Sequence, residues 1–143
     1  MTPADRITSL MTSVPAIPGV TPTDFTTLTL DYRADWVSTL AMDDHEDMAG
    51  TLFFNPDWVH RASDHDIIYA LAFHTVVRSL GITKNPTGVD ERRYSMAVNF
   101  FVNEFLARNC VSPDATTPVL LDPAYRNLEV EAICADLETR YAA

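Results

Sequence analysis

The sequence SDHDIIYALAFHTVVRSLG, residues 63–81, decides the fold of this chain. Ser63 followed three residues later by Asp66 is typical of a capping box in its acidic form, and Gly81 is typical of the residue that follows a helix. Between these signals, apolar side chains from Ile67 to Leu80 cover most of the helix circumference. This pattern indicates a helix that is buried on nearly all sides. We therefore expect a central helix over about residues 64–80.

The rest of the chain predicts a small sheet and three further helices. Prolines in residues 1–24 restrict this segment to a short helix within about residues 3–13 and an extended lead-in. Runs of β-branched and aromatic residues with partial alternation predict strands. The strands are expected at about residues 25–32, 36–41 and 50–56, and the last two helices at about residues 90–108 and from Asp122 onward. Residues 25–143 then form one α+β domain, a three-stranded sheet packed on the central helix with two helices after it.

Charge and composition narrow the classes of partner. The 143 residues include 10 basic and 20 acidic side chains, for a formal net charge of −10, which disfavours nucleic acid and anionic membrane surfaces. No apolar run approaches the ~20 residues that span a bilayer, and no signal peptide begins the chain. Cys110 and Cys134 lack a CxxC pairing, so a disulfide scaffold is not expected. We expect a cytoplasmic protein whose partner is another protein, and the sequence leaves its oligomeric state open.

His74 lies inside the apolar helix and has two interpretations. On spacing alone it is a core histidine bonded to a neighbour, because a metal site needs several convergent ligands. The order of the surrounding motifs favours the second interpretation, a former metal ligand. Phe53-Phe54-Asn55-Pro56 precedes the helix, Asn99 and Val102-Asn103 lie on the next one, and Leu121-Asp122-Pro123 begins the closing segment.

This order of motifs resembles a family of bacterial and phage metallopeptidase domains that are often found beside von Willebrand A-type domains. The family has a zincin-like core, with a strand that ends in a YNP motif, an HExxH helix and a later helix reading roughly W-N-x-A-x-D-x-x-I-N. The resemblance covers about residues 50–138 and implies a zincin-like fold for this chain. In an HExxH helix both histidines bind zinc, and the glutamate activates the attacking water.

The positions that would carry catalysis are replaced here. His74 matches the first histidine, but Thr75 stands at the glutamate position and Arg78 at the second histidine position. Threonine cannot act as a base near neutral pH, and a guanidinium repels a metal ion. Asn99 stands at the aspartate position of the later helix without its charge. The resemblance therefore implies a degenerate member with no catalytic residue and no cofactor, in which His74 is the ligand only if a zinc site persists.

Arg78 needs a partner if its helix is buried, because an unpaired buried charge is strongly unfavourable. We expect it to fill the former metal position in a hydrogen-bond network with His74 and Asn99. The sequence thus favours a pseudo-metallopeptidase that binds protein, such as a phage-encoded inhibitor or regulator of a host protein. The expected contact residues are Arg78, Asn99, Phe100, Asn103, Asp43, Asp44, Glu46 and Asp47. Two alternatives stay open: a metal-dependent peptidase with an atypical zinc site, and an acidic inhibitor that mimics DNA.

Overall fold

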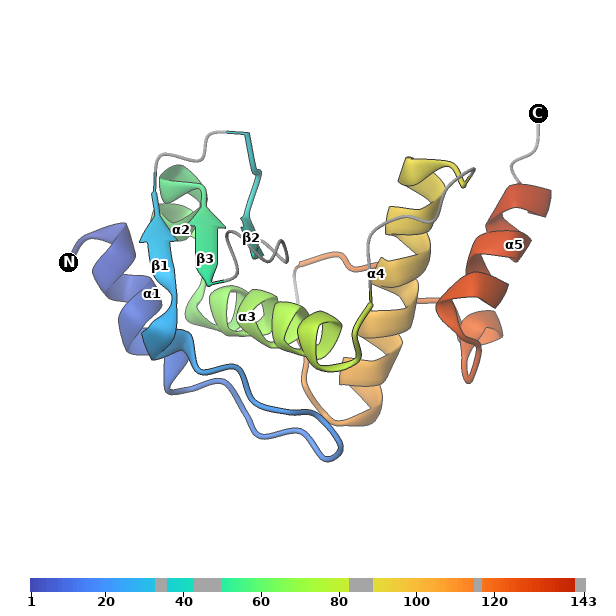
Figure 1. The fold of residues 1–143 in the computed structure, drawn as a ribbon, viewed down its shortest axis with the longest axis horizontal. Coiled ribbons are helices and arrows are strands. Elements are labelled where there is room, and N and C mark those ends of the chain that lie inside the picture. The colour runs from blue at the N-terminus through green and yellow to red at the C-terminus, as the bar shows by residue number, and fades with distance from the viewer. Residues whose placement is uncertain (33–35, 43–49, 83–88, 115–116, 141–143) are drawn as a thin grey trace.

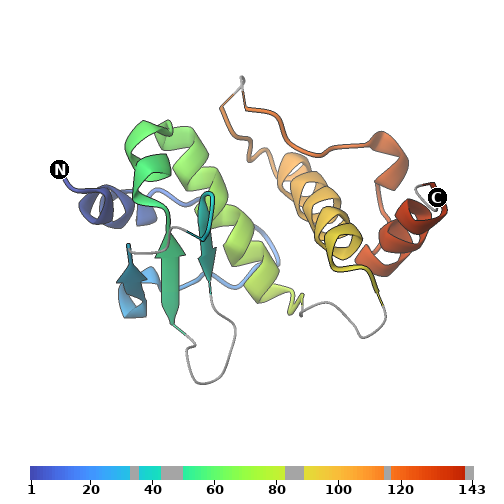
Figure 2. The same ribbon diagram turned by 90° about the horizontal axis from the view of Figure 1, so that it is seen from above.

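The computed structural model describes residues 1–32, 36–42, 50–82, 89–114 and 117–140, and these residues form an α+β fold (Figure 1). A sheet with helices beside it makes up one part of the molecule, and two helices packed on each other make up the other (Figure 2). The elements in chain order are α1 (Pro3–Met11), the 3₁₀ turn η1 (Phe25–Thr27), β1 (Thr29–Asp31), β2 (Leu40–Met42), β3 (Thr51–Phe54), α2 (Pro56–Arg61), α3 (Asp64–Ser79), α4 (Glu91–Arg108), the 3₁₀ turn η2 (Pro123–Tyr125) and α5 (Val130–Arg140).

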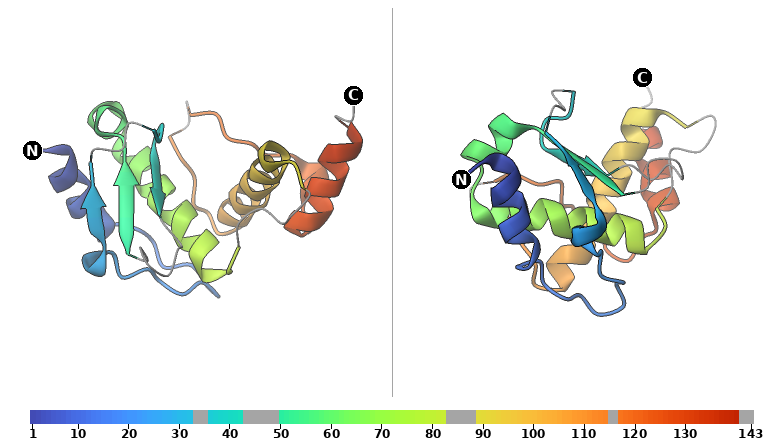
Figure 3. Two further views of the ribbon diagram at one scale, coloured as in Figure 1. Left: turned by 45° about the horizontal axis from the view of Figure 1, so that its top comes forward. Right: turned by 60° about the vertical axis from the view of Figure 1, so that its left-hand side comes forward.

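The sheet has the strand order β1-β3-β2, with β1 parallel and β2 antiparallel to the central strand. Leu52 and Phe54 of β3 are fully buried on one face, in a core that α1, α2 and α3 complete. Phe53 lies on the other face, as strand alternation requires, and its ring centroid is 5.1 Å from that of Trp36. Helix α3 therefore lies behind one face of the sheet (Figure 3).

All three strands are shorter than their sequence patterns predicted, and β1 and β2 differ most. Residues 25–27 form a turn, so β1 pairs with β3 only from Thr29 onward. Strand β2 pairs at Leu40–Met42 rather than over residues 36–41. In the segment before β1, Phe25 is buried and Leu28 packs on the core without forming a ladder, because burial does not require strand pairing.

Helix α2 was not predicted, although its start signal is present in the sequence. Pro56 ends β3 as expected, but it also occupies the first turn of α2. The side chain of Asn55 accepts hydrogen bonds from the backbone N–H groups of Asp57 at 3.0 Å and Trp58 at 3.3 Å. An asparagine followed by proline is a common helix start, so this pair both stops the strand and begins the helix.

Helix α3 confirms the predicted central helix but differs at its first turn. Ser63 accepts a hydrogen bond from the backbone N–H of Asp66 at 3.2 Å, and the chain leaves the helix at Gly81 with a φ of +63°. The carboxylate of Asp66 does not complete a capping box. It accepts instead from the backbone N–H of Asp114 at 2.9 Å and from the hydroxyl of Thr117 at 2.7 Å. The start of α3 is thereby tied to the segment between α4 and η2.

Helices α4 and α5 share a core, and α5 begins later than predicted. Asp122 caps a single 3₁₀ turn by accepting from the backbone N–H of Ala124 at 2.9 Å. The chain then turns at Asn127, which has a φ of +66°, and α5 begins at Val130. The predicted burial of Val130, Ile133, Cys134 and Leu137 is confirmed, and Tyr141 lies outside the described residues.

The N-terminal segment contributes to two cores. Thr2 and Asp5 form a capping box at the start of α1, and Ile7 is fully buried between α1, the sheet and α3. Ile17 of the lead-in is buried in the cluster that joins α3 to α4. Across the described ranges, no helix has the length and apolar character needed to cross a membrane.

Candidate functional site

His74 lies on α3 beside the outer edge of the sheet. The backbone N–H of Asn55, just after β3, donates to the carbonyl of Thr39, just before β2, at 2.8 Å. Because successive carbonyls of a strand point in opposite directions, the carbonyl of Leu40 points away from β3. The Nε2 atom of His74 is 3.1 Å from that carbonyl oxygen. Because a carbonyl oxygen can only accept, Nε2 carries the proton and has no lone pair for a metal ion. His74 therefore satisfies an edge carbonyl of β2.

Thr75, which corresponds to the glutamate position of the resembled family, is only 4% exposed. Its hydroxyl donates to the carbonyl of Leu71 at 2.9 Å, one turn back in the same helix. This is the common local bond of a threonine inside a helix. Thr75 also borders a cavity of about 220 Å³ that Ile17 and Phe25 help to line. A carboxylate at this position would face apolar side chains of the lead-in.

The predicted network around Arg78 is wrong. Arg78 is exposed in the last turn of α3, where it lines an open hollow of about 410 Å³ with Thr21, Asp24 and Ser79. Among the described residues, its guanidinium makes no hydrogen bond or ion pair, so it does not bond to His74 or Asn99. The apolar residues around α3 predicted burial of the whole helix, but a long side chain in the last turn can reach water.

The two asparagines of α4 have different roles. Asn103 is 3% exposed; its Oδ1 accepts from the Tyr69 hydroxyl at 2.6 Å, and its Nδ2 donates to the Leu120 carbonyl at 3.0 Å. It thereby links α3, α4 and the segment before η2. Burial raises the pKa of Tyr69 to about 12, so this hydroxyl stays protonated and donating. Asn99 donates only to the Ser95 carbonyl of its own helix, at 2.8 Å.

The other predicted contact residues fall in different places. Phe100 is partly buried in the core between α4 and α5, where its ring meets that of Tyr125 edge-on at 5.0 Å between centroids. Trp58 packs against the core beside the sheet, whereas Trp36 is 68% exposed. The predicted acidic contact residues lie outside the described residues; they are Asp43, Asp44, Glu46 and Asp47.

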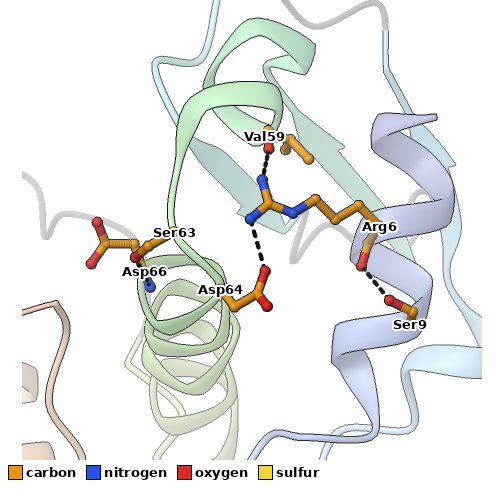
Figure 4. Close-up of polar contacts among 6 residues, drawn as sticks. All are labelled: Arg6, Ser9, Val59, Ser63, Asp64 and Asp66. Carbon is orange, nitrogen blue, oxygen red and sulfur yellow. Dashed lines mark hydrogen bonds and ion pairs between the residues drawn. The ribbon is translucent and has the colours of Figure 1, made fainter. Parts of the chain in front are cut away.

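At the positions that correspond to the metal site of the resembled family, Nε2 of His74 is used in the bond to Leu40, which leaves only Nδ1 of this ring with a lone pair, and the Thr75 hydroxyl is used within its own helix. Within the part of the chain that the structure describes, no three His, Cys, Asp or Glu side chains come close enough together to hold a metal. At the start of α3, Asp64 binds Arg6 at 2.8 Å, and Arg6 also donates to the carbonyl of Val59 (Figure 4). Asp64 therefore joins α3 to α1, and Arg6 joins α1 to α2.

Neither cysteine is placed as an activated nucleophile. Cys134 is buried between α4 and α5, and this burial raises the pKa of its thiol, which keeps it protonated. Cys110 is exposed just after α4, in a turn with a φ of +61°. Tyr125 is also held neutral: burial, together with its hydrogen bond of 2.6 Å to Asp136, raises its pKa to about 12.

A cleft of about 580 Å³ lies between the end of α3, one face of α4 and the connection from η2 to α5. Phe101 and Phe105, one turn apart, line its α4 wall. Leu80 at the end of α3 and Leu128 before α5 also line it, and they are 39% and 37% exposed. Single exposed apolar residues scattered over a protein surface are common, whereas exposed leucines on two walls of one concave surface are typical of a contact site.

The charges that line this cleft are unevenly balanced. Glu104 lies 3.8 Å from Arg108 and 3.5 Å from Arg126, and its side chain is 13% exposed, so two cations neutralise a largely buried carboxylate. Glu129 and Glu131 line the α5 side and are exposed. Among the described residues, neither of these two carboxylates has an ion pair or a side-chain hydrogen bond. The cleft thus combines apolar residues on α4 with an acidic wall on α5.

This cleft could not be predicted from local sequence patterns. Phe101 and Phe105 repeat at helical spacing, which predicts core positions, and both are indeed partly buried. Leu128 was expected inside a longer helix, where an apolar residue needs no further explanation. The available signal was the alternation of Leu128, Glu129, Val130 and Glu131, which places apolar and acidic groups beside one another at the start of α5.

Neither a family model, nor a curated protein, nor a solved structure matches this chain. The positions on α3 and the cleft beside α4 are therefore the features that bear on its function.

Proposed function

We propose that this protein is a pseudo-metallopeptidase with a zincin-like frame, and that it acts by binding another protein. The observation that carries the proposal is the use of the three former catalytic positions. His74 bonds to the sheet edge, Thr75 bonds within its helix, and Arg78 extends into solvent at the helix end. The three side chains thus serve separate local environments, which supports the absence of the three or four convergent ligands that a zinc site needs.

The cleft supports binding as the function that replaces catalysis. Apolar residues surrounded by a charged rim are the usual composition of a protein contact site. Leu80 and Leu128 leave apolar surface in water on two of its walls, and Phe101 and Phe105 extend that surface inward. A folded scaffold without turnover would act as an inhibitor or regulator of its partner, such as a phage-encoded inhibitor or regulator of a host protein.

The loss of catalysis is tested with zinc and a peptide substrate mixture. We expect isothermal titration with Zn²⁺ to give the same weak response for the wild type and His74→Gln, and no cleavage of a mixed peptide library with or without a chelator. Stoichiometric zinc binding that His74→Gln abolishes, together with cleavage that a chelator stops, would establish a peptidase and overturn the proposal.

Binding is tested by quantitative affinity purification from the cells in which the protein is made. Leu128→Ser removes an exposed apolar group from the cleft, and Leu121→Ser is the matched control, since Leu121 is 47% exposed but does not line the cleft. We expect a partner to be retained by the wild type and Leu121→Ser and lost with Leu128→Ser. Retention of no protein above background by the wild type would contradict the proposal.

A further inference from the structure

We infer that the cleft between α3, α4 and α5 binds an extended segment of a protein partner in which an apolar side chain is flanked by lysine or arginine. The inference rests on the proposed function and names the chemistry of what is bound. The volume of the cleft, about 580 Å³, lies within the range of about 300–1,000 Å³ that is typical of clefts for small ligands. A few side chains of an extended segment fit such a space, whereas the face of a folded domain does not.

The apolar part of the segment is indicated by the leucines of the cleft. Leu80 belongs to the end of α3 and Leu128 to the connection before α5, so they come from different walls. An apolar side chain inserted between them would remove both from water and would also reach Phe101 and Phe105. Bulky apolar anchors that enter a pocket provide most of the affinity of many protein contacts.

The basic part of the segment is indicated by Glu129 and Glu131. They flank Val130, the first residue of α5, where the helix N-terminus carries the equivalent of roughly half a positive charge. Two carboxylates exceed that partial charge, so this wall remains negative. The only cation lining the described part of the cleft is Arg108, which is engaged by Glu104 and lies 5.7 Å from the centre of the Phe105 ring.

Charge also argues against other occupants. A second copy of this chain carries the same net charge of −10 and would be repelled. Nucleic acid and acidic peptides are disfavoured for the same reason. A basic segment is attracted both by the whole chain and by the local wall, so long-range and short-range electrostatics act in the same direction.

The test uses three fluorescein-labelled decapeptides and fluorescence anisotropy with the full chain. The first has a central Phe-Leu pair flanked on each side by two lysines; the second has Ser-Ser in place of the pair; the third has glutamates in place of the lysines. We expect saturable binding of the first peptide and binding at least about tenfold weaker for the other two. Because the charges attract, the first affinity should fall as salt is raised.

Substitutions then assign the binding to the cleft. Leu128→Ser should weaken the first peptide roughly tenfold, since burying a leucine contributes on the order of that factor. Glu129→Gln with Glu131→Gln should weaken it up to about fivefold for each carboxylate, the upper limit for an exposed ion pair, and should flatten its salt dependence. The matched control for charge is Asp57→Asn with Glu91→Gln, two exposed acids in the first turns of α2 and α4, neither of which lines the cleft. Circular dichroism and thermal melts show that each variant is folded.

The outcomes separate the inference from the proposed function. Equal or tighter binding of the glutamate peptide, or unchanged binding by the two cleft variants, would overturn the inference. If a cellular partner is nevertheless lost with Leu128→Ser, protein binding stands and the basic character of the segment is wrong. Zinc-dependent cleavage of the peptides would overturn the proposed function itself.

Discussion

Polar residues along α3 and α4 have their hydrogen bonds completed within the fold. Several residues of the cleft, by contrast, remain exposed or lack an ion-pair partner in the described part of the chain. His74, Thr75 and Asn103 each bond to a backbone carbonyl, and Asn103 also holds the Tyr69 hydroxyl. In the cleft, Leu128 remains partly in water, and Glu129 and Glu131 have no cationic partner among the described residues. A position that resembles part of a catalytic motif can therefore serve the fold, whereas the exposed groups of the cleft are the ones that a binding partner could still satisfy.

The largest effect is expected from placing a glutamate at Thr75, the position that corresponds to the catalytic glutamate of the resembled family. Thr75→Glu places a carboxylate at a position that is 4% exposed, beside the apolar lead-in. An unpaired buried charge should lower the free energy of unfolding by about 3–5 kcal/mol. Urea unfolding measures it, with Thr75→Val as the control that removes the hydroxyl but keeps the shape. A Thr75→Glu variant as stable as the wild type would contradict the structural role of this position.

A second test uses alkaline pH to probe the link between α3 and α4. Burial raises the pKa of Tyr69 from an ordinary value of 10.0 to about 12. Below pH 10 the hydroxyl is protonated in both the folded and the unfolded chain; between pH 10 and 12 only the unfolded chain loses the proton, so stability is lost as pH rises through this window. The shift corresponds to a loss of about 2–3 kcal/mol.

Tyr125 titrates in the same window, so the comparison must isolate Tyr69. Unfolding free energies at several pH values for the wild type and Tyr69→Phe give the difference in slope. We expect a shallower decline for Tyr69→Phe. Identical slopes in the two proteins would mean that the Tyr69 hydroxyl is not held in a buried hydrogen bond.

The two asparagines of α4 provide a matched pair. Asn103→Ala leaves the Tyr69 hydroxyl and the Leu120 carbonyl without their partner, and we expect a loss of about 1–3 kcal/mol. Asn99→Ala removes only a bond to the helix's own backbone, and its effect should stay within about 0.5 kcal/mol. Thermal unfolding followed by circular dichroism distinguishes them. Equal losses at both positions would remove the distinction between the buried link and the local bond.

Much of the fold could be predicted because its signals are local. Ser63 and Gly81 mark the limits of α3, and the helical spacing of apolar residues placed α4 and the core of α5. The element boundaries were predicted wrongly where one sequence pattern is compatible with two local structures. Asn55 before Pro56 both ended a strand and began α2, and Asp122 before Pro123 capped one turn rather than a long helix.

The candidate site was less predictable, because it depends on which groups meet across the fold. No local pattern could show that Nε2 of His74 reaches the Leu40 carbonyl, which is 34 residues away. The exposure of Arg78 depends on where α3 ends relative to the lead-in, and the cleft depends on how α3, α4 and α5 diverge. Asn103 was predicted as a contact residue but is buried, because its partners, Tyr69 and Leu120, come from segments distant in sequence.

A smaller effect is expected at His74 itself. His74→Ala leaves the Leu40 carbonyl on the sheet edge without its donor, which should cost about 1 kcal/mol. Because the side chain is only partly buried, water can replace part of the lost bond. His74→Gln retains a donor and should recover some of the stability. An alanine variant that unfolds like the wild type in urea would argue that the histidine does not stabilise the edge.

The smallest change in stability is expected from the variant with the largest expected effect on binding. Leu128 is 37% exposed and lies outside regular structure between η2 and α5, so Leu128→Ser should alter the free energy of unfolding by less than about 0.5 kcal/mol. The same substitution should weaken the basic peptide roughly tenfold, because the exposed part of the leucine is buried only when the cleft is occupied. The two measurements on one variant separate a binding group from a packing group. A stability loss comparable to that of Asn103→Ala would place Leu128 among the structural residues, and the contrast between the cleft and the α3 positions would then disappear.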